Sequence, residues 1–171
     1  MKLDDFLRPL YQDLDGVSRF GEIERVARIA RTLYEPTTDD DRRTFDLLLL
    51  FHGLGKWLEK VGNLSRTLLA VDNVTESDLR RTALSIRRLD APVSDAERAV
   101  VAAVLIDNAG VRGLAERFAR ARREGHSVMD VVREALADAW IPEWLPVAAR
   151  PMLEARHDAR REMCRAILGE V

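Results

Sequence analysis

The chain has 171 residues, with 27 Lys and Arg against 29 Asp and Glu, and its formal net charge is −2. This length suits one domain of ordinary size, and a composition that is 47% apolar and 33% charged argues against disorder. The near-neutral charge makes nucleic-acid binding unlikely as a function and predicts no membrane-binding patch. The apolar runs are far shorter than the roughly 18 residues of a membrane-spanning helix, and the N-terminus lacks the pattern of a signal peptide. We therefore expect a globular, cytoplasmic protein.

The first third of the chain predicts two helices. Apolar residues recur at helical spacing from Ile23 to Leu33, and Pro36 ends this helix. The acidic residues 39–41 suit the first turn of the next helix. Its segment 45–51 is apolar on nearly all sides, which predicts a central buried helix with His52 at its end.

The middle of the chain continues the helical pattern. Asn63 or Ser65 can cap a short helix that extends to Val71, and a further helix is predicted over 75–89. Residues 94–97 (SDAE) form a capping box in front of an apolar run.

Three more helices are predicted in the last third, over 108–123, 127–139 and 151–168. Gly125 is expected to end the first of these, and Pro142 and Pro146 interrupt a linker that contains tryptophans. No segment shows the alternation of a strand, so the predicted fold class is all-α.

The histidines and the cysteine restrict metal chemistry. His52, His126 and His157 lie far apart, and Cys164 is the only cysteine, so no metal-ligand pair and no intramolecular disulfide is expected. The sequence also lacks the GxxxxGK[ST], GxGxxG and GxSxG motifs of P-loop, Rossmann and α/β-hydrolase proteins.

Three segments carry a resemblance to a known family: 22–30 (EIERVARIA), 47–56 (LLLLFHGLGK) and 106–118 (IDNAGVRGLAERF). They resemble the opening helix, the central LLHDIGK motif and a late helical segment of the HD-domain superfamily of metal-dependent phosphohydrolases. The resemblance covers a little over half of the chain and implies an all-helical bundle. We predict a single domain over 1–171, with an HD-like core over about 20–125 and a C-terminal helical extension over about 126–171.

The departures from the family pattern concern its metal site. The resemblance implies a His on the opening helix, a His-Asp pair after the buried helix and a later Asp as ligands. Glu22 stands in place of the first His, and His52 is kept but is followed by Gly53. The later Asp would fall near residues 102–104, which are Ala, Ala and Val, whereas Asp107 matches a family position that is not normally a ligand.

A divalent cation needs several deprotonated donors that converge at about 2.0–2.3 Å, and this chain keeps only one of the expected ligands. We therefore expect no cofactor and no resident metal. The predicted function is that of a degenerate, non-catalytic binding or regulatory module that holds a small phosphorylated ligand. The candidate catalytic residues are His52, Glu22 and Asp107, and the candidate ligand-binding residues are Lys56 and Arg88.

Two other functions remain open at the level of sequence. One is a metal-dependent phosphohydrolase whose substituted shell uses His52, Glu22 and Asp107 as ligands. The other is a structural protein that forms homo-oligomers through Trp140 and Trp144, although we favour packing of these rings on their own chain.

Several candidate residues also have a purely structural interpretation. His52 can satisfy its ring on a backbone carbonyl, Asp107 can act as a helix cap together with Asn108, and Arg88 can be a solvated arginine. His157 and Asp158 form a His-Asp dipeptide that we interpret as coincidental. Cys164 is expected to be an inert, packed thiol.

Overall fold

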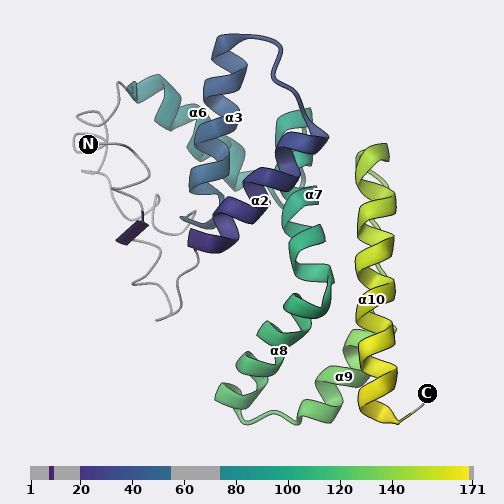
Figure 1. Ribbon diagram of the computed structural model, residues 1–171. Helices are drawn as coiled ribbons and strands as arrows, with labels where there is room; N and C mark the ends of the chain where they lie inside the picture. The colour runs from purple at the N-terminus through teal and green to yellow at the C-terminus, as the bar shows by residue number, and fades with distance from the viewer. Residues whose placement is uncertain (1–7, 10–19, 55–73, 170–171) are drawn as a thin grey trace. The chain divides into compact units, whose positions relative to one another are not determined.

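The computed structural model describes residues 8–9, 20–54 and 74–169, and it contains helices but no strands in these segments. The prediction of an all-α fold is therefore confirmed for the described residues. The predicted short helix ending at Val71, and Lys56, lie outside them. The described α-helices are α2 (Phe20–Leu33), α3 (Asp39–Phe51), α6 (Glu76–Arg87), α7 (Asp95–Ala109), α8 (Val111–Glu124), α9 (Val128–Ala137) and α10 (Arg150–Leu168), with 3₁₀ turns η1 (His52–Leu54) and η2 (Val147–Ala149) (Figure 1).

The contacts of the chain group into two compact units, Met1–Val101 and Ala102–Val171. This division falls within α7. Whether the chain folds as a single domain stays a prediction.

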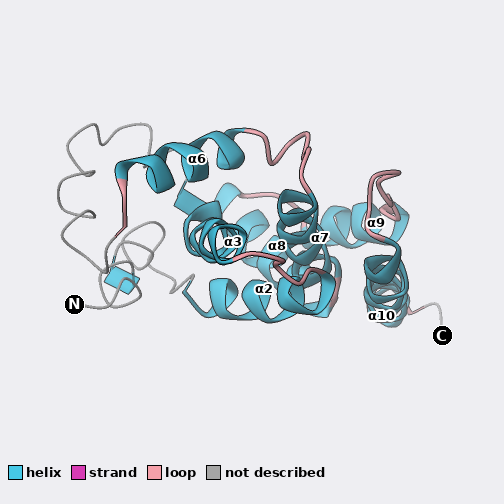
Figure 2. Ribbon diagram, turned by 90° about the horizontal axis from the view of Figure 1, so that it is seen from above, coloured by secondary structure: helices cyan, strands magenta, loops and turns pink. Residues whose placement is uncertain are grey.

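Helix α3 is the centre of the first unit. Thr38 caps its first turn, because the hydroxyl of Thr38 accepts a hydrogen bond from the backbone N–H of Asp41 at 3.1 Å. Helix α3 packs against α6 and α2, which lie beside it (Figures 1 and 2). The predicted central buried helix is confirmed, since its buried side chains are Phe45, Leu47, Leu48, Leu49 and Phe51.

Capping boxes define the starts of α6 and α7. At α6, Thr75 and Asp78 exchange hydrogen bonds between side chain and backbone. At α7, the Glu97 N–H donates to the Ser94 hydroxyl and the Ser94 N–H donates to the Glu97 carboxylate, each at 3.2 Å. The capping box predicted over 94–97 is therefore confirmed.

In the second unit, α10 packs against α9 and α8. Its core contains Leu114 of α8, Val132 and Ala135 of α9, and Cys164 of α10, all of them buried. Gly125 ends α8 in the left-handed conformation (φ 73°), which glycine adopts without steric cost, as predicted.

The predicted helix start at Asn108 is wrong. Helix α7 continues to Ala109, because its buried residues Ile106 and Ala109 extend the apolar face by one more turn. The break falls at Gly110, whose extended backbone precedes α8 without a side-chain cap. Asp107 and Asn108 therefore lie in the last turn of α7.

The packing predicted for Trp140 is also wrong, since this side chain is 63% exposed. In the linker between α9 and η2, the buried residues are Pro142 and Leu145, and Trp144 is half-buried.

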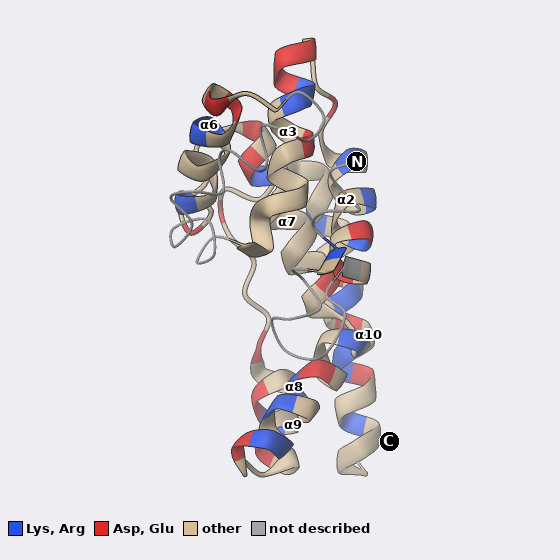
Figure 3. Cartoon of the chain, turned by 90° about the vertical axis from the view of Figure 1, so that its left-hand side faces the viewer, with Lys and Arg blue, Asp and Glu red and all other residues tan. Residues whose placement is uncertain are grey.

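Charges of both signs are interspersed along the described helices, with an acidic first turn in α3 (Figure 3). Along residues 20–54 and 74–169, no helix is both long enough and apolar enough to cross a bilayer.

Candidate functional site

His52 follows the last residue of α3 and begins η1. Its Nδ1 lies 2.7 Å from the backbone carbonyl oxygen of Leu49, so this nitrogen must carry the proton that it donates. Burial lowers the pKa of His52, and the hydrogen bond to Leu49 only partly opposes that shift. The ring is therefore neutral at pH 7 and has one nitrogen, Nε2, with a lone pair. This geometry agrees with the structural interpretation of His52.

Arg88, the predicted ligand-binding arginine, lies directly after α6 and pairs with a buried carboxylate. Its Nη2 is 2.7 Å from Oε1 of Glu97, whose side chain is only 1% exposed. Burial by itself would raise the pKa of Glu97, but hydrogen bonds from the Val93 and Ser94 backbone and the charge of Arg88 outweigh it, so the net pKa is lowered. Arg88 is thus held by the carboxylate that caps α7, while 41% of its side chain is exposed to solvent.

The other candidates are distributed over the chain. Glu22 is half-buried in the first turn of α2, and Asp107 is half-buried at the end of α7. Glu22 and His52 belong to the first compact unit and Asp107 to the second. No group of three or more His, Cys, Asp or Glu side chains in residues 20–54 and 74–169 converges as metal ligands would.

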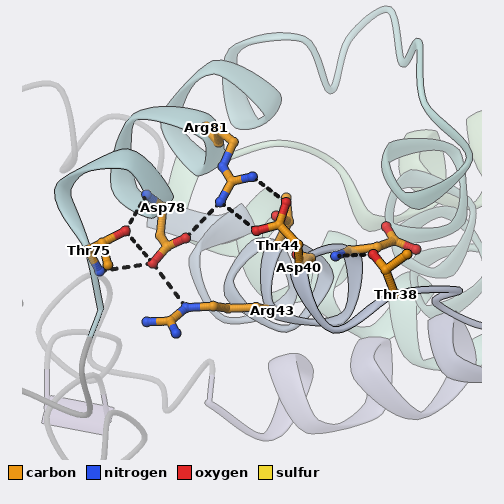
Figure 4. Close-up of polar contacts among 8 residues, drawn as sticks. Thr38, Asp40, Arg43, Thr44, Thr75, Asp78 and Arg81 are labelled. Carbon is orange, nitrogen blue, oxygen red and sulfur yellow. Dashed lines mark hydrogen bonds and ion pairs between the residues drawn. The ribbon is translucent and has the colours of Figure 1, made fainter.

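A polar cluster that the sequence analysis did not identify joins α3 to α6 (Figure 4). Its centre is Asp78, which is 4% exposed. The Asp78 carboxylate accepts hydrogen bonds from the backbone and the hydroxyl of Thr75, at 2.9 and 2.6 Å, and pairs with Arg43 and Arg81, both at 2.9 Å. Arg81 also forms a two-point contact with Asp40, at 2.5 and 2.9 Å.

These contacts decide the charge of Asp78. Burial favours the neutral acid, yet the Thr75 and Arg81 hydrogen bonds and the Arg43 charge lower the pKa of Asp78 below its ordinary value. The only local signal for this site was the TESD sequence at 75–78, which fits a capping box. The arginines could not be assigned from sequence, because Asp40 and Arg81 are 41 residues apart.

A second cluster that the sequence analysis missed lies in the other unit, at the end of α9. The Asp138 carboxylate pairs with Arg117 at 2.7 Å and lies 3.4 Å from Nη1 of Arg160. Its backbone carbonyl accepts a hydrogen bond from Arg160 and lies 3.3 Å from Nδ1 of His157. Arg160 is 1% exposed and His157 is 5% exposed, so both polar side chains are part of the interior.

The sequence did contain a signal for this cluster. Leu153, His157, Arg160 and Cys164 follow one another at steps of four, three and four, which places them on one helix face. We interpreted the His157-Asp158 dipeptide as coincidental. The structure separates the two residues, because His157 is buried whereas Asp158 is exposed and pairs with Arg161.

An open pocket of about 340 Å³ lies where α2 turns into α3. It contains none of the site residues predicted from the sequence. The residues that line it are Arg31, Tyr34, Glu35, Pro36, Arg42, Phe45 and Asp46.

A search of protein-family models finds no match to this chain, and comparisons with curated proteins and with solved structures likewise find none.

Proposed function

We propose that this chain is a degenerate HD-like domain that acts as a non-catalytic binding or regulatory module for a small phosphorylated ligand. The observation that supports the proposal is the ion pairing of the two buried carboxylates among the described residues. Asp78 and Glu97 are both paired with arginine, and both have a lowered pKa.

This pairing is unfavourable for carboxyl catalysis. A general acid needs a raised pKa so that it keeps its proton near pH 7, and a general base needs an accessible lone pair. Asp78 and Glu97 remain ionised, and their oxygens accept hydrogen bonds from Thr75, from Arg88 and from the backbone of 93–94. Such carboxylates stabilise the helices that carry them and do not transfer protons.

The remaining motif residue suits binding better than catalysis. His52 donates Nδ1–H to its own helix, so only Nε2 is left for a ligand. A phosphate group would take its main contacts from cations, for which Lys56 and Arg88 are the sequence candidates. Arg88 uses Nη2 for Glu97 and keeps a side chain that is 41% exposed, so it can contact a ligand while it remains paired.

The first test is elemental analysis of the freshly purified chain, followed by calorimetric titration of Mn²⁺ and Zn²⁺ into the wild type and His52→Ala. We expect no tight site that depends on His52. About one tight ion per chain that His52→Ala abolishes would overturn the proposal and favour the phosphohydrolase with a substituted shell. His52→Asn is the second variant, since it keeps a polar group if the alanine variant unfolds.

The second test concerns the ligand. AMP, glucose 6-phosphate and inorganic pyrophosphate are titrated into the metal-free wild type, and the thermal unfolding midpoint is followed. A ligand that binds only the folded chain stabilises it by RT ln(1 + L/Kd), where L is the free ligand concentration, so the midpoint rises further as that concentration increases. We expect at least one of these phosphates to raise it, whereas no response to any of them would contradict a phosphate-binding function.

A further inference from the structure

The pocket at the α2–α3 turn has two guanidinium groups at its wall. Nη2 of Arg31 lies 2.9 Å from Oδ1 of Asp46, which engages one of the several donors of this arginine. Arg42 is exposed, and its side chain makes no ion pair or hydrogen bond within the described part of the chain.

The helix geometry explains why Arg42 has no partner. Asp46 is four residues after Arg42 on α3, the spacing at which an aspartate commonly pairs with an arginine. Arg31 of α2 holds Asp46 instead. The pocket therefore presents the full set of donors of Arg42, which fit two oxygens of a phosphate or carboxylate at once.

The pocket lining also includes two aromatic rings that are held in place. The rings of Tyr34 and Phe45 meet edge to face, with centroids 5.2 Å apart. The Tyr34 hydroxyl donates to the Asp41 carboxylate at 2.6 Å, and burial together with this bond raises the pKa of Tyr34 to about 12. Tyr34 therefore stays neutral, and with the ring of Pro36 it offers a rigid apolar surface.

The carboxylates limit the charge that the pocket can accept. Asp46 is neutralised by Arg31, whereas Glu35 is exposed and lines the same pocket. Glu35 repels an anion, and this repulsion grows with the charge of the ligand. A singly or doubly charged group is therefore accepted better than a polyphosphate.

From these contacts we propose that this pocket binds a phosphate monoester that carries an aromatic group. Arg42 contacts the phosphate, Arg31 contributes a remaining donor, and Tyr34 and Pro36 pack against the ring, while Phe45, which is 1% exposed, supports Tyr34 from the core. This inference rests on the proposed function for its ligand class, but it assigns the phosphate to Arg42 of the α2–α3 pocket and not to the sequence candidates Lys56 and Arg88.

The test is calorimetric titration of phenyl phosphate into the wild type, Arg42→Gln and Arg28→Gln. Arg28 is an exposed arginine on α2 outside the pocket lining, so it is the matched control. We expect Arg42→Gln to weaken phenyl phosphate binding about tenfold or more, because a hydrogen bond to a charged group is lost. Arg28→Gln should bind like the wild type, and both inorganic phosphate and phenol should bind more weakly than phenyl phosphate.

Other outcomes separate this inference from the proposed function. If phenyl phosphate binds Arg42→Gln as tightly as the wild type, the pocket assignment is wrong. Loss of binding in Lys56→Gln or Arg88→Gln would then leave the proposed function standing at the site predicted from the sequence. If neither phenyl phosphate nor any of the other phosphates binds the wild type, both proposals fail.

Discussion

Gly113 of α8 lies directly against the backbone carbonyl of Asn108, so that a methyl group added to Gly113 would stand 1.7 Å from the Asn108 oxygen. This close approach follows the break at Gly110, where α7 ends and α8 begins. No side chain other than hydrogen fits this position without a shift of the backbone.

Gly113→Ala should therefore destabilise the chain by about 1–3 kcal/mol, as overpacking does. The sign of this stability change is informative, because replacing glycine by alanine inside a helix otherwise stabilises a protein by up to about 1 kcal/mol. Urea unfolding followed by circular dichroism measures the change. The control is Gly21→Ala in α2, where the nearest atom is the end of the Arg25 side chain at 3.5 Å, an ordinary contact. Equal stability of the two variants would contradict the close approach.

Asp78→Asn should lower the free energy of unfolding by about 1.5–3 kcal/mol, because it removes charged hydrogen bonds that link α6 to α3. The matched control is Glu76→Gln. Glu76 pairs with Arg80 on the exposed face of the same helix, and such pairs contribute at most about 1 kcal/mol. If both variants unfold at the same denaturant concentration, the cluster in Figure 4 does not stabilise the contact between α3 and α6.

The same carboxyl predicts a direction for acid unfolding. The pKa of Asp78 is lower in the folded chain than its ordinary value of 3.8. Its contribution is therefore fully present above that value and is lost as the pH falls through the lower, folded pKa. Unfolding curves of the wild type and Asp78→Asn, measured from pH 5 downward, should converge, and curves that stay parallel would contradict the shift.

His157 predicts a second dependence on pH, at milder values. Burial and the neighbouring charge of Arg160 lower the pKa of His157 below its ordinary value of 6.5, although the Asp138 carbonyl and carboxylate oppose the shift. The unfolded chain therefore takes up this proton before the folded chain does, and stability falls as the pH drops below about 6.5. His52, whose pKa is also lowered by burial, adds to the same slope.

Chemical denaturation at several pH values between 7.5 and 5 measures that slope. His157→Gln should reduce it and leave the part that comes from His52. His126→Gln is the matched control, because that ring is exposed in the loop after α8. An unchanged slope in His157→Gln would show that His157 does not titrate differently in the folded chain.

Cys164 is the only thiol of the chain, so its reactivity can be followed without interference. It is buried in the core of the second unit, and burial raises the pKa of its thiol. We expect a thiol reagent such as DTNB to react slowly with the native chain and rapidly in urea. Equally fast reaction in both would contradict the packing of α10 against α8 and α9.

The fold was predictable wherever a local pattern determines it. The capping box at Ser94 and Glu97 and the glycine that ends α8 are signals within a few residues, and both were predicted correctly. The sequence pattern placed the helix start at Asn108, whereas the break lies at Gly110. The buried positions Ile106 and Ala109 extend α7 beyond the polar residues that suggested a cap.

The polar clusters were not predictable in the same way. Asp138 meets Arg117 and Arg160 across 21 and 22 residues, and no spacing rule identifies which of 24 arginines will pair with it. His52 was identified from its motif, but the hydrogen bond to Leu49 that decides its role requires the local geometry of the helix end. The pocket at Arg42 was missed because its lining combines a helix end, a turn and a second helix.

Arginine is the partner of Asp78, Glu97 and Asp138 alike, in a sequence that holds only three lysines. A guanidinium group keeps its proton far above the pH at which a lysine amine loses it. Mildly alkaline solution, in which lysine amines begin to lose their protons, therefore leaves the arginine pairs of Asp78 and Glu97 intact, whereas acid removes them by protonating the carboxylates. The consequence is a molecule in which acid breaks these charge pairs before base does.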